Sequence, residues 1–199
     1  DTPPALAKVI AEENKKPDMP SALAKAIDKC DLDTVKSILE KNPEFVNTKG
    51  AFETAPLHIA AHKCSKDMIQ LLISKGANVN ARHSTLNIEM HGSTDSAKYI
   101  VKKGLTALHV IASSHKKHST ENAKILITNG ANINAKTSNG RTPLHIAIES
   151  MNVEMVKFLI DNGANVNVKD INGKTPLSIA LEQNYQETIN LLKAHGDVE

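Results

Sequence analysis

A repeated motif constrains the fold of this chain more than any other feature of its sequence. One copy opens with Thr-Pro-Leu-His at 142–145 and closes with Gly-Ala-Asn-Val-Asn at 163–167. The same frame returns at Ser178, and 178 − 145 equals 33 residues. Earlier copies begin at 55–58 and 106–109. A fixed period of this length is typical of a solenoid, in which small units stack along one axis.

Each unit has the pattern of two short helices. Thr142 can cap the first helix through its hydroxyl, and Pro143 suits the first helical position, where its missing N–H leaves nothing unpaired. The second helix carries an apolar stripe at three- and four-residue spacing, formed by Val153, Val156, Leu159 and Ile160. Gly163 supplies the left-handed conformation that ends such a helix. One unit cannot bury its apolar face alone, so each must be covered by the next.

The Thr-Pro-Leu-His opening and the Gly-Ala-Asn ending recur in register, and they resemble the ankyrin repeat. The resemblance covers roughly residues 21 to 196. It implies an all-α ankyrin-repeat solenoid, built from helix-turn-helix repeats with β-hairpin loops, called fingers, between them. We expect, in chain order, an N-terminal capping helix at 1–20, a degenerate first repeat at 21–49, a second repeat at 50–81, an extended finger insertion at 82–103, and further repeats at 104–136, 137–169 and 170–199.

The insertion enlarges the finger between the second and third repeats. Asn80 and Gly104 are 24 residues apart, whereas Asn134 and Gly140 are 6 apart, which leaves 24 − 6 = 18 extra residues. Apolar and polar residues alternate on both sides of a turn-like segment, and the apolar ones are Leu86, Ile88, Met90, Tyr99 and Val101. Alternation is the period of a β-strand, so we predict a long β-hairpin, with a disordered loop as the alternative.

The charges of the chain argue against strongly charged partners. It has 24 basic and 22 acidic residues and a net charge of +2, and only Arg82 and Arg141 are arginine. This balance gives little attraction to nucleic acid or to a membrane surface. No apolar run is long enough to span a bilayer, and no signal peptide is visible after Asp1. We therefore predict no nucleic-acid partner, no membrane insertion, a monomer, and a cytoplasmic location.

The two cysteines, Cys30 and Cys64, occupy the same position of successive repeats, in the turn between the paired helices. Packed helices lie about 10 Å apart, whereas a disulfide needs Cα atoms within about 7 Å of each other. The sequence therefore predicts two free thiols in a reducing compartment.

The residue patterns carry no marks of a catalytic, cofactor or metal site. His58 and His62 have the one-turn spacing of zinc ligands, but Ile59 stands where the zinc-protease motif needs a glutamate base. No serine or cysteine lies in a glycine elbow, and no glycine-rich phosphate loop follows a strand. The resemblance implies instead that His58, His109 and His145 bond backbone between units. We predict no enzyme activity, no cofactor and no metal.

Three asparagines, Asn80, Asn134 and Asn167, close the finger entrances, each eight residues after a leucine. The pattern is similar to the one that asparaginyl hydroxylation uses in ankyrin proteins. The same residues are also structural consensus, so both interpretations stay open.

The resemblance implies protein binding, because ankyrin stacks bind through finger tips and the exposed face of the first helix, which line a concave groove. Aromatic anchors are scarce in the chain, so Phe52 and Tyr99 are the first residues to test. The candidate partner-binding residues, read by register and including the inserted finger, are Phe52, Thr54, His62, Lys63, Leu86, Ile88, Met90, Tyr99, Val101, Leu105, Ser113, Ser114, Ser138, Asn139, Arg141, Glu149, Ser150, Ile171, Asn172, Lys174, Glu182 and Gln183.

We expect a non-catalytic scaffold that binds a partner protein. As the alternative, the chain is the targeting or substrate-recruiting region of a larger enzyme, or of a secreted effector of an intracellular bacterium or parasite that acts in the host-cell cytosol. A chain that starts at Asp1 and ends at Glu199, with a high content of lysine and asparagine, is compatible with this alternative.

Overall fold

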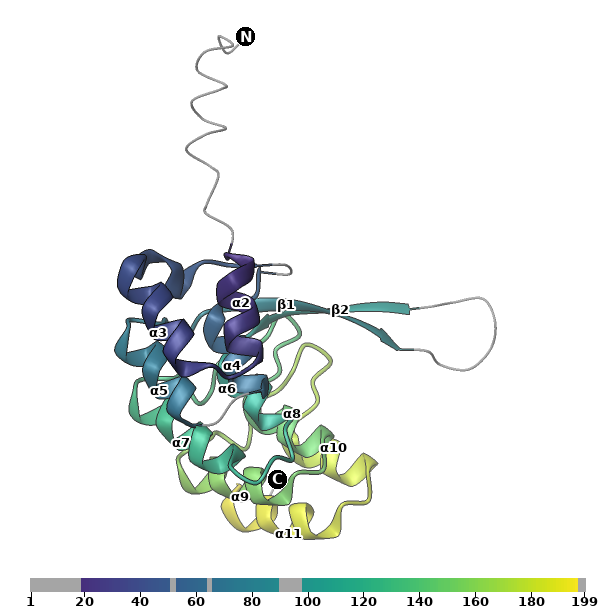
Figure 1. Cartoon of the computed structure of the whole chain (residues 1–199). Helices are drawn as coiled ribbons and strands as arrows, with labels where there is room; N and C mark the ends of the chain where they lie inside the picture. Colours follow the sequence, from purple (N-terminus) through teal and green to yellow (C-terminus); the bar gives the residue numbers. More distant parts are fainter. Residues whose placement is uncertain (1–18, 51–52, 64–65, 90–97, 197–199) are drawn as a thin grey trace, which may run out of the picture.

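A curved row of helix pairs makes up the computed structural model, which describes residues 19–50, 53–63, 66–89 and 98–196, with the backbone alone for 84–89 and 98–103 (Figure 1). The pairs are α2 (Ser21–Asp28) with α3 (Leu32–Lys41), α4 (Pro56–Lys63) with α5 (Lys66–Ser74), α6 (Ala107–Ala112) with α7 (Ser119–Thr128), α8 (Pro143–Glu149) with α9 (Val153–Asp161), and α10 (Pro176–Glu182) with α11 (Gln186–His195). A 3-10 turn, η1 (Pro43–Asn47), follows α3. The predicted all-α solenoid is confirmed, while the helix predicted for 1–20 falls outside the described residues except for its last two.

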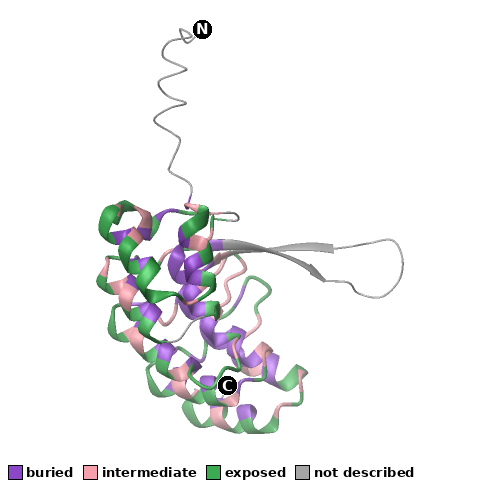
Figure 2. Cartoon of the chain, in the orientation of Figure 1, coloured by how far each residue is buried: buried purple, intermediate pink, exposed green. Residues whose placement is uncertain are grey.

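The helices form two layers. The inner helices α2, α4, α6, α8 and α10 each contact the next inner helix, and the outer helices α3, α5, α7, α9 and α11 do the same. Figure 2 shows buried residues concentrated along the inner helices and exposed ones along the outer helices. Since every helix packs on its counterpart in the adjacent repeat, stability comes from stacking of nearest neighbours.

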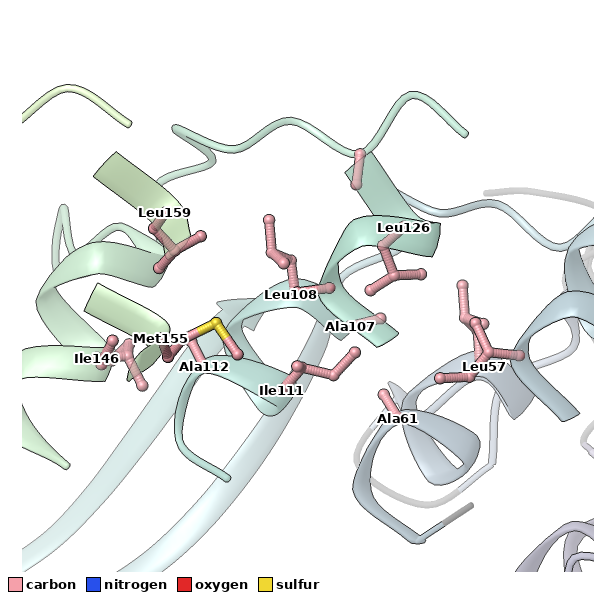
Figure 3. Packing of buried hydrophobic residues seen from close by; sticks show 14 of the residues in the cluster. Leu57, Ala61, Ala107, Leu108, Ile111, Ala112, Leu126, Ile146, Met155 and Leu159 are labelled. Atoms are coloured by element: carbon pink, nitrogen blue, oxygen red, sulfur yellow. The ribbon is translucent and has the colours of Figure 1, made fainter. Parts of the chain in front are cut away.

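One hydrophobic cluster runs through all the described repeats, from Met19 to Leu192. Figure 3 shows its middle part, where Leu57 and Ala61 of α4 lie beside Leu108 and Ile111 of the neighbouring helix α6. These side chains are at most 4% exposed. Small side chains recur at one inner-helix position of three repeats, Ala60, Ala147 and Ala180, where they are fully buried and let adjacent helices approach closely.

Local sequence signals explain where the helices begin. Thr142 caps α8, with Pro143 at the first helical position, and Thr106 and Thr175 occupy the same place before α6 and α10. The turn between paired helices adopts a left-handed conformation at the same register position of different repeats, with φ of 54° at Met151 and 53° at Asn184. The frame read from the sequence is therefore the frame of the fold.

The insertion forms the predicted β-hairpin. Strand β1 (His83–Glu89) pairs antiparallel with β2 (Lys98–Leu105), and the register matches Leu86 with Val101 and Ile88 with Tyr99. The hairpin projects away from the helix stack (Figure 1). Its base is tied to the second repeat, because Nε2 of His58 lies 3.0 Å from the carbonyl oxygen of Ala81 and 3.2 Å from that of Leu105.

The prediction of two free thiols is wrong for Cys30, which is disulfide-bonded. Cys64 is the only other cysteine of the chain, and it lies outside the described residues. The spacing between helix axes is a poor guide to the distance between two Cα atoms at the ends of these helices. There α2 and α4 contact each other, and Nζ of Lys63 lies 2.7 Å from Oδ1 of Asp28. The inference of a reducing compartment loses its support with this correction.

Two glycines in matching finger positions should differ in how much stability an alanine substitution removes. Gly140 and Gly173 both have positive φ, 74° and 76°. A Cβ on Gly140 would lie 3.0 Å from the backbone N of Ile171, whereas a Cβ on Gly173 would meet nothing within 4 Å. Both alanine substitutions should lower the free energy of unfolding by about 1 kcal/mol because of the left-handed conformation. Gly140→Ala should lower it by about 1–2 kcal/mol more because of crowding. Urea unfolding of the two variants measures the difference, and equal losses would contradict this close contact between fingers.

Candidate partner-binding groove

The repeated histidines lie beneath the concave side and join each repeat to the next. Nδ1 of His109 accepts a hydrogen bond of 3.1 Å from the backbone N–H of Thr106, at the start of its own helix. Its Nε2 lies 3.1 Å from the carbonyl oxygen of Arg141, in the following finger. Since a carbonyl only accepts, Nε2 carries the hydrogen and the imidazole is neutral. His145 repeats the arrangement with Thr142 and Lys174.

Burial keeps these imidazoles uncharged. It lowers the pKa of His109 from its ordinary value of 6.5 to about 4. Burial, followed by the charge on the neighbouring imidazole of His83, lowers the pKa of His58 to about 4 as well. The rings of His58 and His83 meet edge to face, with centroids 4.3 Å apart. These histidines have structural partners on both ring nitrogens, as the resemblance implied, with Ala55 and the hairpin base serving His58.

A cavity of about 460 Å³ opens on the concave side, where α4, α6 and the base of the hairpin meet. Its volume lies within the range of ligand pockets. Most of the side chains around it are apolar or imidazole, and the lining includes Lys63 but no arginine, aspartate or glutamate. The residues that line it are Thr54, His58, Ile59, His62, Lys63, His83, Leu105, His109, Val110, Ser113 and Ile146.

The structure brings five of the predicted partner-binding residues together around this cavity: Thr54, His62, Lys63, Leu105 and Ser113. Leu105 is 8% exposed, so it presents its side chain to the cavity rather than to open solvent. Phe52 and Met90 lie outside the described residues, and for Leu86, Ile88, Tyr99 and Val101 the structure gives the strand backbone alone.

The remaining predicted residues lie farther along the stack. Ser138, Ile171, Asn172 and Glu182 are exposed, and Ser114, Asn139, Arg141, Glu149, Ser150, Lys174 and Gln183 are half-buried. Several of them are engaged within the chain, because Arg141 pairs with Glu149 and Lys174 pairs with Glu182. Their part in binding stays a prediction.

Asp170 is a buried charged residue that the sequence reasoning missed. Its side chain is fully buried and lies 3.3 Å from Nε of Arg141. Burial by itself would raise the pKa of Asp170, but the backbone N–H groups of Lys174 and Asn172 and the guanidinium of Arg141 together lower it. The Asp-Ile-Asn-Gly run at 170–173 was a usable signal, since an aspartate opening a turn bonds the backbone that follows.

Sequence reasoning also passed over most of the cavity floor. Ile59, Val110 and Ile146 each follow the signature histidine directly, and all three line the cavity. That regular position after the histidine was the available signal. Ile59 and Val110 remain partly exposed, as residues that can contact a ligand must be.

The asparagines that close the finger entrances connect neighbouring repeats. The side chain of Asn80 donates to the carbonyl of Gly130 at 2.9 Å and accepts from the backbone N–H of Asn132 at 2.8 Å. Asn134 likewise accepts from the N–H of Asn165 at 2.8 Å. A structural role therefore accounts for these two residues.

Within the described residues, no group of three or more histidine, cysteine, aspartate or glutamate side chains could hold a metal ion. Over the same part of the chain, every helix is too short or too polar to cross a bilayer.

Comparison with known proteins identifies the class. The sequence matches the family of ankyrin repeats, three copies, over residues 4–83, 87–170 and 108–199. The chain belongs to the ankyrin-repeat family. Ankyrin repeats are a non-catalytic fold that mediates protein–protein interaction, although some relatives also contain kinase or channel regions.

Three relatives show how the family uses such segments within longer proteins. The chain is 29% identical to the Nuclear factor NF-kappa-B p105 subunit of Gallus gallus, across 61% of this chain and 14% of that protein. It is 30% identical to a probable serine/threonine-protein kinase of Dictyostelium discoideum, across 62% of this chain and 13% of the kinase. It is 32% identical to Ankyrin repeat and SOCS box protein 6 of Homo sapiens, across 43% and 25% of the two chains. The chain thus spans a quarter or less of these relatives.

The neutral histidines predict how stability depends on pH. The folded-state pKa of His58 and His109 is about 4, below the ordinary value of 6.5. Between pH 6.5 and about pH 4 the unfolded state binds protons at these histidines and the folded state does not. The free energy of unfolding is therefore highest above pH 6.5 and decreases as pH falls through this window. Each histidine contributes about 1.4 kcal/mol per pH unit within this window. Chemical unfolding at pH 7, 6 and 5 measures the slope.

Two variants isolate the source of that slope. His109→Gln should reduce the slope by about one histidine's share, because one buried imidazole is gone. His115→Gln, in an exposed loop, should leave the slope as in the wild type. A stability that stays flat from pH 7 to 5, or a slope that His109→Gln does not change, would contradict the neutral imidazole.

Proposed function

We propose that the chain is a non-catalytic scaffold that binds a partner protein through its concave groove and the inserted hairpin. The observation that carries the proposal is the cavity of about 460 Å³ at the place where the groove and the hairpin base meet. Ankyrin repeats generally mediate protein–protein interaction, and a concave pocket lined by apolar groups is a favourable place for a partner's side chain.

The inserted hairpin supports the same proposal. The described strands β1 and β2 form a sheet of two strands that pair with one another. A two-stranded hairpin is marginally stable in water unless something packs on it. Its tie to the stack is at the base, through His58. A partner that lies in the groove would extend naturally onto this projecting element.

A second candidate function is that these repeats serve as the targeting or recruiting region of a longer protein. The observation that favours it is the small share of each relative that the chain covers, 13% of the kinase for example. The recruiting region of a secreted effector, acting in the host-cell cytosol, is a narrower form of this candidate. The full open reading frame decides between a free-standing scaffold and a recruiting region. The cytoplasmic location expected from the sequence stays a prediction, and the disulfide at Cys30 argues against a reducing compartment.

Affinity capture with matched variants tests the scaffold function. In one variant, a six-residue finger replaces residues 84–103 of the insertion, so that His83 is kept, and in another Tyr99→Ala removes an aromatic side chain from β2. Loop closure entropy grows slowly with length, so the shortened protein should melt within a few degrees of the wild type. We expect it to lose most of the proteins that the wild type retains, and Tyr99→Ala to lose part of them.

The control is Lys124→Glu, an exposed position on the outer helix α7. This variant should retain the same proteins as the wild type. If the shortened protein retains them fully while Lys124→Glu loses them, binding uses the outer surface and the proposed groove is wrong.

A further inference from the structure

The fourth and fifth repeats each carry an ion pair from the finger to the inner helix. Arg141 and Glu149 stand four residues before and four residues after His145, and they form one pair. Lys174 and Glu182 stand in the same relation to Ser178, with Nζ and Oε2 2.6 Å apart. We call this contact the finger-to-helix ion pair. It fills the edge of the groove with side chains of the chain itself.

The second and third repeats lack this pair. Four residues before and after His58 stand Thr54 and His62, and around His109 the same positions hold Leu105 and Ser113. Neither repeat can form the pair, because no carboxylate occupies either position. All four of these residues line the cavity. The cavity therefore lies at the two repeats in which the finger-to-helix ion pair is missing.

The floor of the cavity is suited to an apolar group. Ile59, Val110 and Ile146 line it from three successive inner helices, and Leu105 lines it from the hairpin base. The imidazoles of His58 and His109 are uncharged at neutral pH, since burial lowers the pKa of each to about 4. An apolar side chain that leaves water for such a floor gains free energy in proportion to the area it buries.

The rim is positively charged. Lys63 lies on it, and no aspartate or glutamate is among the lining residues. The ammonium of Lys116 reaches the carbonyl of His62, which places a second lysine beside the rim. Among the described residues, Lys63 of the rim pairs with the carboxylate of Asp28, and that pair is exposed and contributes little. The strands that rise from the cavity edge contain Lys98, Lys102 and Lys103 against one acid, Glu89.

We propose that this cavity binds an apolar anchor side chain from an acidic segment of the partner protein. The anchor is a large aliphatic or aromatic side chain seated on the floor, and aspartate or glutamate residues beside it face the lysines of the rim. The inference rests on the proposed scaffold function and adds the partner's chemistry to it. Charge complementarity decides the sign of the flanking residues and increases the rate of association.

A random peptide library displayed on phage, selected against the immobilised full chain, is the probe. Enriched peptides should contain one leucine, isoleucine, methionine or phenylalanine next to at least two acidic residues. Their affinity should decrease as sodium chloride is raised, because the rim is exposed. Ser113→Trp, at an exposed position at the end of α6, should fill the cavity and weaken binding at least tenfold. Lys124→Trp, on the outer helix α7, adds the same side chain away from the groove and should bind like the wild type.

A second variant tests the role of the missing ion pair. Leu105→Arg combined with Ser113→Glu transfers the finger-to-helix ion pair into the third repeat. This double variant should also lower the affinity for the selected peptides at least tenfold. Gel filtration of each variant shows whether the fold is kept.

The outcomes separate this inference from the proposed function. If Ser150→Trp in the fourth repeat weakens peptide binding and Ser113→Trp does not, the groove is still the binding surface. The proposal that the anchor binds in the cavity would then be wrong. Enriched peptides without acidic residues, or no enrichment at all, would overturn the acidic anchor segment. Dimers of the wild type that Ser113→Trp dissociates would show a second copy as the occupant, against the proposal.

Discussion

Stacking from the second repeat to the fifth depends on one interaction, the hydrogen bonds of a neutral imidazole that spans two repeats. In His109 one ring nitrogen accepts from the start of its own helix and the other lies 3.1 Å from a carbonyl oxygen of the next finger. The same side chain thus fixes where a helix begins and how far away the next repeat lies. A charged imidazole would place a donor against the N–H of Thr106, so burial and hydrogen bonding agree on the neutral form.

This constraint leaves the rim of the groove free to vary. The histidine is used for stacking at His58, His109 and His145, and the threonine cap precedes three of the inner helices. The positions four residues to either side of the histidine are not needed for stacking. In two repeats they hold opposite charges that pair within the chain, and in two others they hold Thr54, His62, Leu105 and Ser113 around a cavity. The fold is uniform along its length, whereas the surface offered to a partner is not.

Sequence alone predicted the solenoid and its register, because a 33-residue period and its caps are local signals. It also predicted the hairpin, since alternation at Leu86 and Ile88 is a two-residue period. It did not find the ion pair between Arg141 and Glu149, because whether two half-exposed charges meet depends on the path of the finger. It missed the disulfide at Cys30 because a spacing between helix axes was applied to the end of a helix.

A partner should bind most strongly where the finger-to-helix ion pair is missing. Hydrogen–deuterium exchange of the chain, with and without a captured partner, tests it most directly. We expect slower exchange on binding in α4, α6 and the hairpin base, with α8, α10 and the outer helices little changed. Slower exchange confined to α8 and α10, or to the outer helices, would contradict it.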